Sequence, residues 1–293
     1  MKAIPLDGLA KWSPWPARLL GLEPWTVPQR TLEKVEREYN LTKYAQCLQF
    51  YRSTSPPPNL EALVRWEGDP AGSLCLSLGN ELFETTLQVA REQAFDLLAS
   101  TLRPVLAECR TVIECGCGYG YNLWRLSQSF PELTFLGGEY SGNAVELAQA
   151  LYRQSPQIRV TRFNFYDPAT YEFIEAVKEP MVVFTCHALE QTPSAAAFID
   201  ALAAGRRHIR HVFHFEPVVE LHDDSLLGLM RRGYAKANDY NMDLLSALRA
   251  RPWVRILQTR ADVFGANPLN PTSVIHWQFT PGMVCPPTPE LKA

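Results

Sequence analysis

The stretch Thr-Val-Ile-Glu-Cys-Gly-Cys-Gly-Tyr-Gly, residues 111–120, sets the fold expected of this chain of 293 residues. An apolar run meets an acid and then glycines at every second position, Gly116, Gly118 and Gly120, before a helical pattern over residues 121–129. This order predicts a strand, a tight loop and a helix N-terminus. Glycine adopts positive φ and lets a ligand approach the backbone closely. The turn therefore predicts a nucleotide cradle.

The spacing of the glycines excludes two nucleotide loops. The dinucleotide fingerprint G-x-G-x-x-G would need a glycine at Tyr121 or Leu123, and a P-loop would need a following Gly-Lys-Ser/Thr. The pattern E-x-G-x-G-x-G over residues 114–120 instead resembles the first motif of class I S-adenosylmethionine-dependent methyltransferases. In that family the loop wraps an amino acid and a ribose. The resemblance implies S-adenosyl-L-methionine as cofactor, contacted by Glu114, Gly116, Gly118 and Gly120.

Three more strands are predicted downstream, each followed by residues that suit a nucleoside. Residues 133–138, 158–163 and 181–184 are the apolar runs. In open α/β sheets ligands bind at the carboxyl ends of the strands, and an acid there can accept both ribose hydroxyls. After the third strand the family often has an acid that accepts a hydrogen bond from the adenine amine. This chain has Asn164 there, whose side-chain oxygen can accept the same bond, and Asp167 is the alternative. The cofactor contacts expected here are Glu139, Tyr140, Asn164, Phe165 and Thr185.

The resemblance covers residues 86–283 and implies a Rossmann-like α/β fold. It implies a seven-stranded sheet in the order 3-2-1-4-5-7-6, with the last strand antiparallel. Strands five to seven are expected at residues 210–215, 254–258 and 273–279. Helical stretches are expected at residues 225–235 and 240–248, between strands five and six.

Residues 1–85 are expected to form a helical and irregular cap. Their start is rich in proline and tryptophan, a helical pattern covers residues 31–52, and three consecutive prolines follow at 56–58. Residues 60–65 and 82–102 also have a helical pattern, the latter leading into the catalytic domain. In small-molecule methyltransferases such additions commonly roof the substrate cavity. Residues 284–293 are expected to be a proline-bearing C-terminal tail.

His187 is the first choice for a catalytic base, because it follows strand four and histidine titrates near neutral pH. The alternative is a structural role in capping the next helix. His214 and Glu216 are further catalytic candidates, since alternation puts both on one face of strand five, near its carboxyl end. With the acidic loop that follows, they could hold a metal, but ordinary strand histidines and a solvated loop are the favoured interpretation. A lone C-x-C also argues against zinc, so no metal is predicted.

Three tyrosines are candidates for substrate contacts. Tyr44 and Tyr51 lie seven residues apart on one helical face, and Tyr240 lies in a loop rich in turn-forming residues. Helical spacing of aromatic residues also fits simple packing, so that alternative stays open.

Composition narrows the partners and the compartment. The chain is 46% hydrophobic and 20% charged, with a net charge of −3, so no basic footprint for nucleic acid is present. No apolar run approaches 18 residues and no signal-peptide core begins the chain. Seven cysteines without secretory features fit a reduced compartment. We expect a cytoplasmic protein that binds neither nucleic acid nor membranes, with a homodimer left open.

The expected function is S-adenosylmethionine-dependent methyl transfer to a small molecule, with O-methylation favoured and N- or C-methylation open. A peptide or protein substrate is an alternative. Aminopropyl transfer on the same fold is another, but it needs an acidic motif after strand four, where this chain has Thr185-Cys186-His187. A non-catalytic scaffold is the third alternative.

Overall fold

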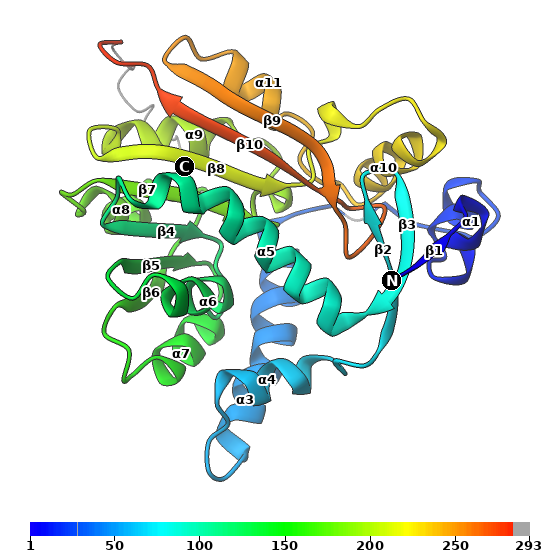
Figure 1. Ribbon diagram of the computed structural model, residues 1–293, viewed down its shortest axis with the longest axis horizontal. Coiled ribbons are helices and arrows are strands. Elements are labelled where there is room, and N and C mark those ends of the chain that lie inside the picture. The colour runs from blue at the N-terminus through cyan, green and yellow to red at the C-terminus, as the bar shows by residue number, and fades with distance from the viewer. Residues whose placement is uncertain (28, 284–293) are drawn as a thin grey trace.

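The computed structural model describes residues 1–27 and 29–283, so the predicted tail at residues 284–293 lies outside the described residues. The chain forms a large α/β unit and a small antiparallel sheet beside it (Figure 1). The elements before the glycine loop are β1 (Lys2–Ile4), η1 (Leu6–Lys11), α1 (Trp15–Leu19), α2 (Leu32–Val35), η2 (Glu36–Tyr44), α3 (Ala45–Ser53), α4 (Leu60–Glu67), β2 (Ser73–Leu78), β3 (Glu81–Thr86), α5 (Leu87–Leu106) and β4 (Thr111–Cys115). Those after it are α6 (Tyr121–Ser129), β5 (Thr134–Glu139), α7 (Gly142–Leu151), β6 (Ile158–Arg162), η3 (Pro168–Tyr171), α8 (Glu172–Glu175), β7 (Met181–Cys186), η4 (Leu189–Gln191), α9 (Ala196–Leu202), η5 (Ala203–Gly205), β8 (Ile209–Glu216), η6 (Val219–Leu221), α10 (Leu226–Ala237), α11 (Leu244–Arg249), β9 (Val254–Phe264) and β10 (Thr272–Phe279).

The main sheet has seven strands in the order β6-β5-β4-β7-β8-β10-β9. Counted from β4, this is the predicted order 3-2-1-4-5-7-6. β4 pairs in parallel with both β5 and β7, whereas β10 runs antiparallel to β8 and β9. The predicted fold class is therefore confirmed, and the carboxyl ends of the parallel strands meet along one edge of the sheet.

Each face of the main sheet supports its own hydrophobic core. Side chains alternate along a strand, so Val112 packs with α5, α6 and α7, while its neighbour Ile113 packs with α8, α9 and α11. In the same way Val182 and Val183 of β7 belong to opposite cores. Four central strands, covered on both faces, are thus held rigidly, which fixes the loops at their ends.

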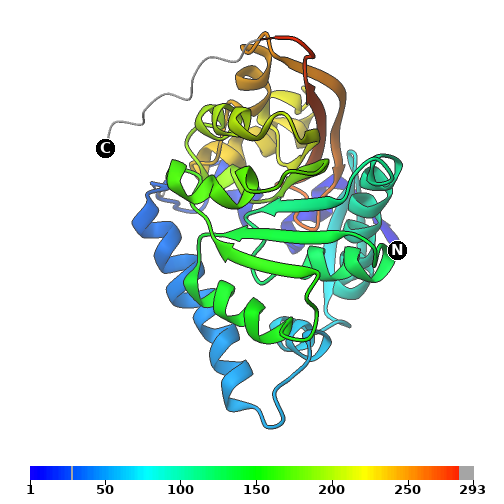
Figure 2. The ribbon, with the colours of Figure 1, turned by 90° about the vertical axis from the view of Figure 1, so that its left-hand side faces the viewer.

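The N-terminal helix confirms the pattern seen over residues 31–52. It runs through α2, η2 and α3, residues 32–53, and Thr31 caps it by accepting a hydrogen bond from the backbone N–H of Lys34. We call this element the roof helix. Figure 2 shows it running past the carboxyl ends of the parallel strands.

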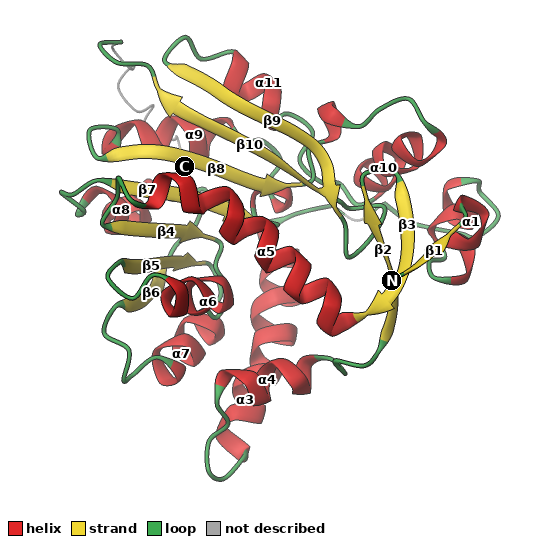
Figure 3. Ribbon diagram, viewed as in Figure 1, coloured by secondary structure: helices red, strands yellow, loops and turns green. Residues whose placement is uncertain are grey.

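The prediction of a purely helical and irregular cap is wrong in one respect. Residues 73–86 form the β2–β3 hairpin, and with β1 they make a three-stranded antiparallel sheet beside the main one (Figure 3). The start of the helix predicted over residues 82–102 is therefore a strand, and α5 begins only at Leu87. The missed signal was the two-residue turn Gly79-Asn80, where Gly79 has φ +58°. Later, α11 is shorter and β9 longer than their predicted segments.

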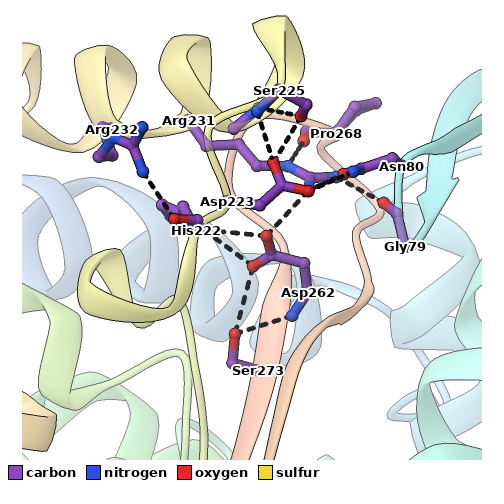
Figure 4. Close-up of polar contacts among 11 residues, drawn as sticks. Gly79, Asn80, His222, Asp223, Ser225, Arg231, Arg232, Asp262, Pro268 and Ser273 are labelled. Atoms are coloured by element: carbon purple, nitrogen blue, oxygen red, sulfur yellow. Dashed lines mark hydrogen bonds and ion pairs between the residues drawn. The ribbon is translucent and has the colours of Figure 1, made fainter.

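A buried arginine ties the hairpin to the main sheet (Figure 4). Arg231 of α10 is wholly buried, and its guanidinium donates to the carbonyl of Gly79, to Oδ1 of Asn80 and to the carbonyl of Pro268 at 2.7–3.0 Å. It also pairs with Asp262 of β9 at 2.9 Å. One side chain thus connects the hairpin turn, α10, β9 and the loop between β9 and β10.

Asp262 completes this cluster. Besides Arg231 it accepts hydrogen bonds from Nδ1 of His222 at 2.8 Å and from Oγ of Ser273 at 3.3 Å. Its own backbone N–H donates to Ser273 at 2.9 Å, and its φ is +49°. Because a buried carboxylate must be paired to be tolerated, these contacts fix the point where β9 enters its loop.

Candidate active site

A cavity of about 370 Å³ lies at the carboxyl ends of β4, β5 and β7, under the roof helix. We call it the first cavity. The predicted cofactor residues that line it are Glu114, Gly116, Gly118, Glu139, Tyr140, Asn164 and Phe165. Residues separated by up to 51 positions in the chain are therefore brought to one hollow, as the rule for open α/β sheets requires.

The glycine loop needs its glycines for two physical reasons. Gly116 and Gly118 have φ of +81° and +56°, a region that L-residues with a side chain rarely adopt. A Cβ on Gly116 would collide with the Cβ of Ala188, and one on Gly118 would collide with the hydroxyl of Tyr44. Gly120 does not line the first cavity; it precedes α6 with φ +80° and has Tyr152 close to it. Gly120 was predicted to contact the cofactor, but in the structure it shapes the turn before α6.

Glu139 holds the glycine loop while facing the first cavity. One carboxylate oxygen accepts the backbone N–H of Gly118 and the other that of Ser141, both at 2.8 Å. Burial raises the pKa of Glu139, while the two backbone bonds act in the opposite direction. The acid at the tip of β5 thus links the two loops on which a nucleoside would rest.

Glu114 brings an unpaired oxygen to the same cavity. Oε1 accepts a hydrogen bond from Asn122 at 2.7 Å, whereas buried Oε2 has no hydrogen-bond partner among the described residues. Burial raises the pKa of Glu114 to about 8. Asn122, at the start of α6, also lines the cavity and was not predicted. An unsatisfied buried acceptor is costly, so this oxygen is suited to a donor on a bound ligand.

The far side of the first cavity is formed after β6. Oδ1 of Asn164 accepts the backbone N–H of Tyr166 at 3.0 Å, which leaves one lone pair of that oxygen and the amide N–H groups. Phe165 packs edge-to-face on Phe163 and Phe198, which fixes its ring. The alternative acid, Asp167, caps η3 and does not line the cavity.

The roof helix supplies a wall that sequence reasoning found only in part. Its lining residues share one helical face: Leu32, Val35, Tyr39, Lys43 and Tyr44. Of these only Tyr44 was predicted, as a substrate contact; it lies buried above Gly118. Asn40 anchors the helix, since its Oδ1 accepts from Oγ of Ser141 and from the backbone N–H of Asn143. The helical spacing of these residues can be read from the sequence. Which way that face of the helix points depends on the tertiary contact of Asn40.

His187 lies at the end of the first cavity, with φ +49° and about a third of its side chain exposed (35%). Its Nδ1 lies 3.3 Å from Oε2 of Glu190, and its Nε2 lies 2.8 Å from Oγ1 of Thr272. Burial alone would lower the pKa of His187. The hydrogen bond and charge of Glu190, together with the charge of Glu216, raise it above the ordinary value instead.

His214 and Thr185, predicted as a catalytic candidate and a cofactor contact, do not line the first cavity. Both side chains are fully buried in the sheet, and Oγ1 of Thr185 lies 3.0 Å from Nδ1 of His214. Nε2 of His214 accepts a hydrogen bond from Trp277 at 3.0 Å, so that nitrogen carries no proton. Burial lowers the pKa of His214 to about 3. His214 lies on the same face of β8 as Glu216, as the alternation of side chains predicts, but this face is covered by other parts of the protein.

Glu216, predicted as a catalytic candidate, likewise does not line the cavity. Its carboxylate is 1% exposed and accepts the backbone N–H groups of Ala188, Leu189 and Glu190 at 3.1–3.2 Å. Burial raises its pKa to about 7. Glu216 therefore positions the loop that carries His187.

Two predicted substrate residues also lie elsewhere. Tyr51 of α3 packs against the core formed with α5, α6 and α7, and it does not line the first cavity. Tyr240 packs on Tyr234, and the guanidinium of Arg30 lies 4.9 Å from its ring centre. The contacts of Tyr240 hold the chain segment before the roof helix, and the position of Tyr51 fits the packing alternative.

Within residues 1–27 and 29–283, none of the helices combines the length and the hydropathy needed to span a bilayer. Over the same residues, no group of three His, Cys, Asp or Glu side chains is arranged to hold a metal ion.

No protein-family model matches the chain, and no curated protein matches it in sequence. Among solved structures, a magnesium protoporphyrin IX methyltransferase from Synechocystis PCC 6803 with bound SAH is similar over 76% of this chain and 96% of its own, at 15% identity and a TM-score of 0.47. The plantazolicin methyltransferase BpumL is similar over 65% and 83%, at 11% identity and a TM-score of 0.45.

WbdD is similar over 62% of this chain, at 15% identity and a TM-score of 0.39, and the chain spans 39% of the length of that protein. Such low identities leave the activity to be argued from the site. The order and directions of the seven strands are those that the sequence resemblance implied. The chain therefore has the class I methyltransferase fold.

Proposed function

We propose that this protein is an S-adenosylmethionine-dependent methyltransferase that acts on a small molecule, with an oxygen as the favoured acceptor atom. The observation that carries the proposal is the position of two carboxylates, Glu114 and Glu139, on either side of a glycine loop in one cavity, with one Glu114 oxygen buried and unpaired among the described residues.

The first cavity suits the charge and shape of this cofactor. Glu139 would hold the ribose hydroxyls, Glu114 and Asn122 the amino group, and the side chains after β5 and β6 the adenine. Three carboxylates line the cavity, from Glu114, Glu139 and Glu190, against a single lysine among the described lining residues. A ligand with a positive sulfonium would be favoured by Glu190, whose pKa is lowered, and would favour the ionised forms of Glu114 and Glu139. The cofactor supplies a methyl group on that sulfonium.

The protein's own part is to position the acceptor, to remove its proton and to exclude water. Ionised Glu190 accepts the Nδ1 proton of His187, which leaves Nε2 of His187 as the basic atom. Nε2 takes the acceptor's proton directly or through the hydroxyl of Thr272, which lies 2.8 Å away. Glu216 fixes this loop by its three backbone contacts, and the roof helix keeps solvent out. Positioning of this kind accounts for much of an enzyme's rate.

Calorimetry with S-adenosylhomocysteine tests the proposal. The wild-type protein should bind it. Glu139→Ala should weaken binding by at least about a hundredfold, because it removes the hydrogen bonds that hold the two loops, together with the proposed contact to the sugar. Glu132→Ala is the matched control, since Glu132 is an exposed acid just before β5. No heat from the wild-type protein would favour a non-catalytic scaffold. Equal affinities of wild type and Glu139→Ala would contradict the assigned site.

A further inference from the structure

A second cavity, of about 310 Å³, adjoins the first one. It lies between α5, the end of β8 and the loop that joins β9 to β10, and this loop contributes Ala266, Asn267 and Asn270. Cys186 and His187 line both cavities. The two hollows therefore meet at the loop after β7, where the proposed base lies.

The second cavity has its own opening. Ala94 on α5 and Ala266 on the β9–β10 loop are exposed and lie at its walls, whereas Leu98, Phe215 and Phe264 are buried. None of these residues lines the first cavity, and none belongs to the roof helix. A ligand that enters past α5 would therefore not pass the roof helix.

The walls of the second cavity select an uncharged ligand. None of the described residues that line it is Asp, Glu, Lys or Arg, and most of them are Leu, Phe or Ala. Burying a charge without a partner is strongly unfavourable. The volume is at the lower end of the range typical of small-molecule sites.

Asn270 gives the cavity one polar requirement. Its Nδ2 donates to Oε2 of Glu190 at 3.0 Å, and because an ionised carboxylate only accepts, this bond fixes which side of the amide is oxygen. Oδ1 of Asn270 is buried and has no hydrogen-bond partner among residues 1–27 and 29–283. A ligand that brings an O–H or N–H group to this end of the cavity would satisfy it.

The polar cluster around Arg231 holds this wall in place. Arg231 donates to the carbonyl of Pro268 at 3.0 Å, and the backbones of Ser77 and Gly265 exchange two hydrogen bonds of 2.8 and 2.9 Å (Figure 4 shows the arginine). The loop that carries Asn270 is therefore fastened to the small sheet at one end and to α10 at its middle.

We propose that the second cavity is the acceptor site, and that it takes a neutral, mostly apolar molecule with one O–H or N–H group. The inference rests on the proposed methyl transfer. For a hydroxyl acceptor, the O–H that donates to Asn270 on binding turns to Nε2 of His187 for the reaction. There the O–H bond breaks and its proton goes to Nε2, an O–C bond forms, and the C–S bond of the cofactor breaks with its electron pair staying on sulfur. Asn270 selects the donor group, and the apolar walls select the body of the molecule.

Binding of 2-naphthol to the full-length protein, followed by its fluorescence in saturating S-adenosylhomocysteine, tests this site. The neutral phenol should bind. 2-Methoxynaphthalene, which lacks the O–H, should bind about tenfold more weakly, and 2-naphthoate, which is charged, more weakly still. Asn270→Leu should remove the difference between 2-naphthol and its methyl ether. Failure of 2-naphthol to bind, or equal affinity for all three probes, would overturn the proposal.

Two variants test the location. Ala94→Trp and Ala266→Trp each place an indole at the opening, and each should weaken 2-naphthol binding at least about tenfold. Val89→Trp is the control, because Val89 is exposed on the same helix and lines neither cavity. Affinity for S-adenosylhomocysteine should be unchanged in all three variants. Undiminished 2-naphthol binding in both opening variants would refute the site. If the wild-type protein does not bind S-adenosylhomocysteine, the proposed function is refuted instead.

Discussion

The two cavities that share His187 are built in different ways. The first has three carboxyl groups among its lining residues and draws its key residues from the ends of β4 and β5 and the loops that follow them. The second is mostly apolar, has no Asp, Glu, Lys or Arg among its described lining residues, and is assembled mainly from α5, β8 and the β9–β10 loop. The key residues of the first cavity thus belong to short sequence motifs, whereas the second cavity forms only when segments distant in the sequence pack together. In our two proposals, the first cavity recognises the cofactor and the second recognises the acceptor.

The largest effect that would separate the two regions is expected at Arg231. Arg231→Met removes one partner of a buried ion pair and should lower the free energy of unfolding by about 3–5 kcal/mol, because Asp262 stays buried without its cation. Urea denaturation measures this. Below the transition, 2-naphthol should bind more weakly while S-adenosylhomocysteine binds as before. Weaker binding of S-adenosylhomocysteine with unchanged binding of 2-naphthol would show that the cluster supports the first cavity.

Gly118→Ala should act on the first cavity alone. The positive φ costs a residue with a side chain about 1–2 kcal/mol, and the new Cβ would collide with the hydroxyl of Tyr44. We expect affinity for S-adenosylhomocysteine to fall about tenfold. Adding Tyr44→Phe to Gly118→Ala removes the colliding hydroxyl and should restore part of the loss. Strictly additive effects in this double-mutant cycle would mean that the two residues do not meet.

The contrast also explains what the sequence could and could not predict. The glycine loop, Glu139 and the strand order follow from local patterns, and the structure bears out the fold. His214 and Glu216 lie outside the first cavity, because alternation assigns a face of the strand but does not say what covers it. Here Trp277 and the backbone after β7 form hydrogen bonds with their polar atoms. Asn270 and Ala94 had no signal, since their roles depend on segments about 175 residues apart.

The junction between the cavities can be tested by pH. The base must be neutral, so turnover should rise with pH through the pKa of His187, which lies above its ordinary value. Glu190→Gln removes a negative charge beside Nδ1, so the pKa should fall and the rising limb should move about one unit to lower pH. A limb that stays in place, or that moves to higher pH, would exclude His187 as the titrating group.

The smallest effect is expected at Tyr51, which belongs to neither cavity. Tyr51→Phe should change the affinities for S-adenosylhomocysteine and for 2-naphthol by less than about twofold, since its ring packs in the core and lines neither hollow. Tyr44→Phe is the informative partner, because Tyr44 lies on the same helix but faces Gly118. A large effect of Tyr51→Phe on either ligand would place the substrate against the outer end of the roof helix.

A crystal structure with bound S-adenosylhomocysteine tests the central claim most directly. We predict the ribose hydroxyls at Glu139, the amino group at the free oxygen of Glu114, and the sulfur turned toward His187 and the second cavity. A ligand whose ribose lies away from Glu139, or whose adenosyl group fills the apolar cavity beside Phe215 and Phe264, would contradict this division of the site.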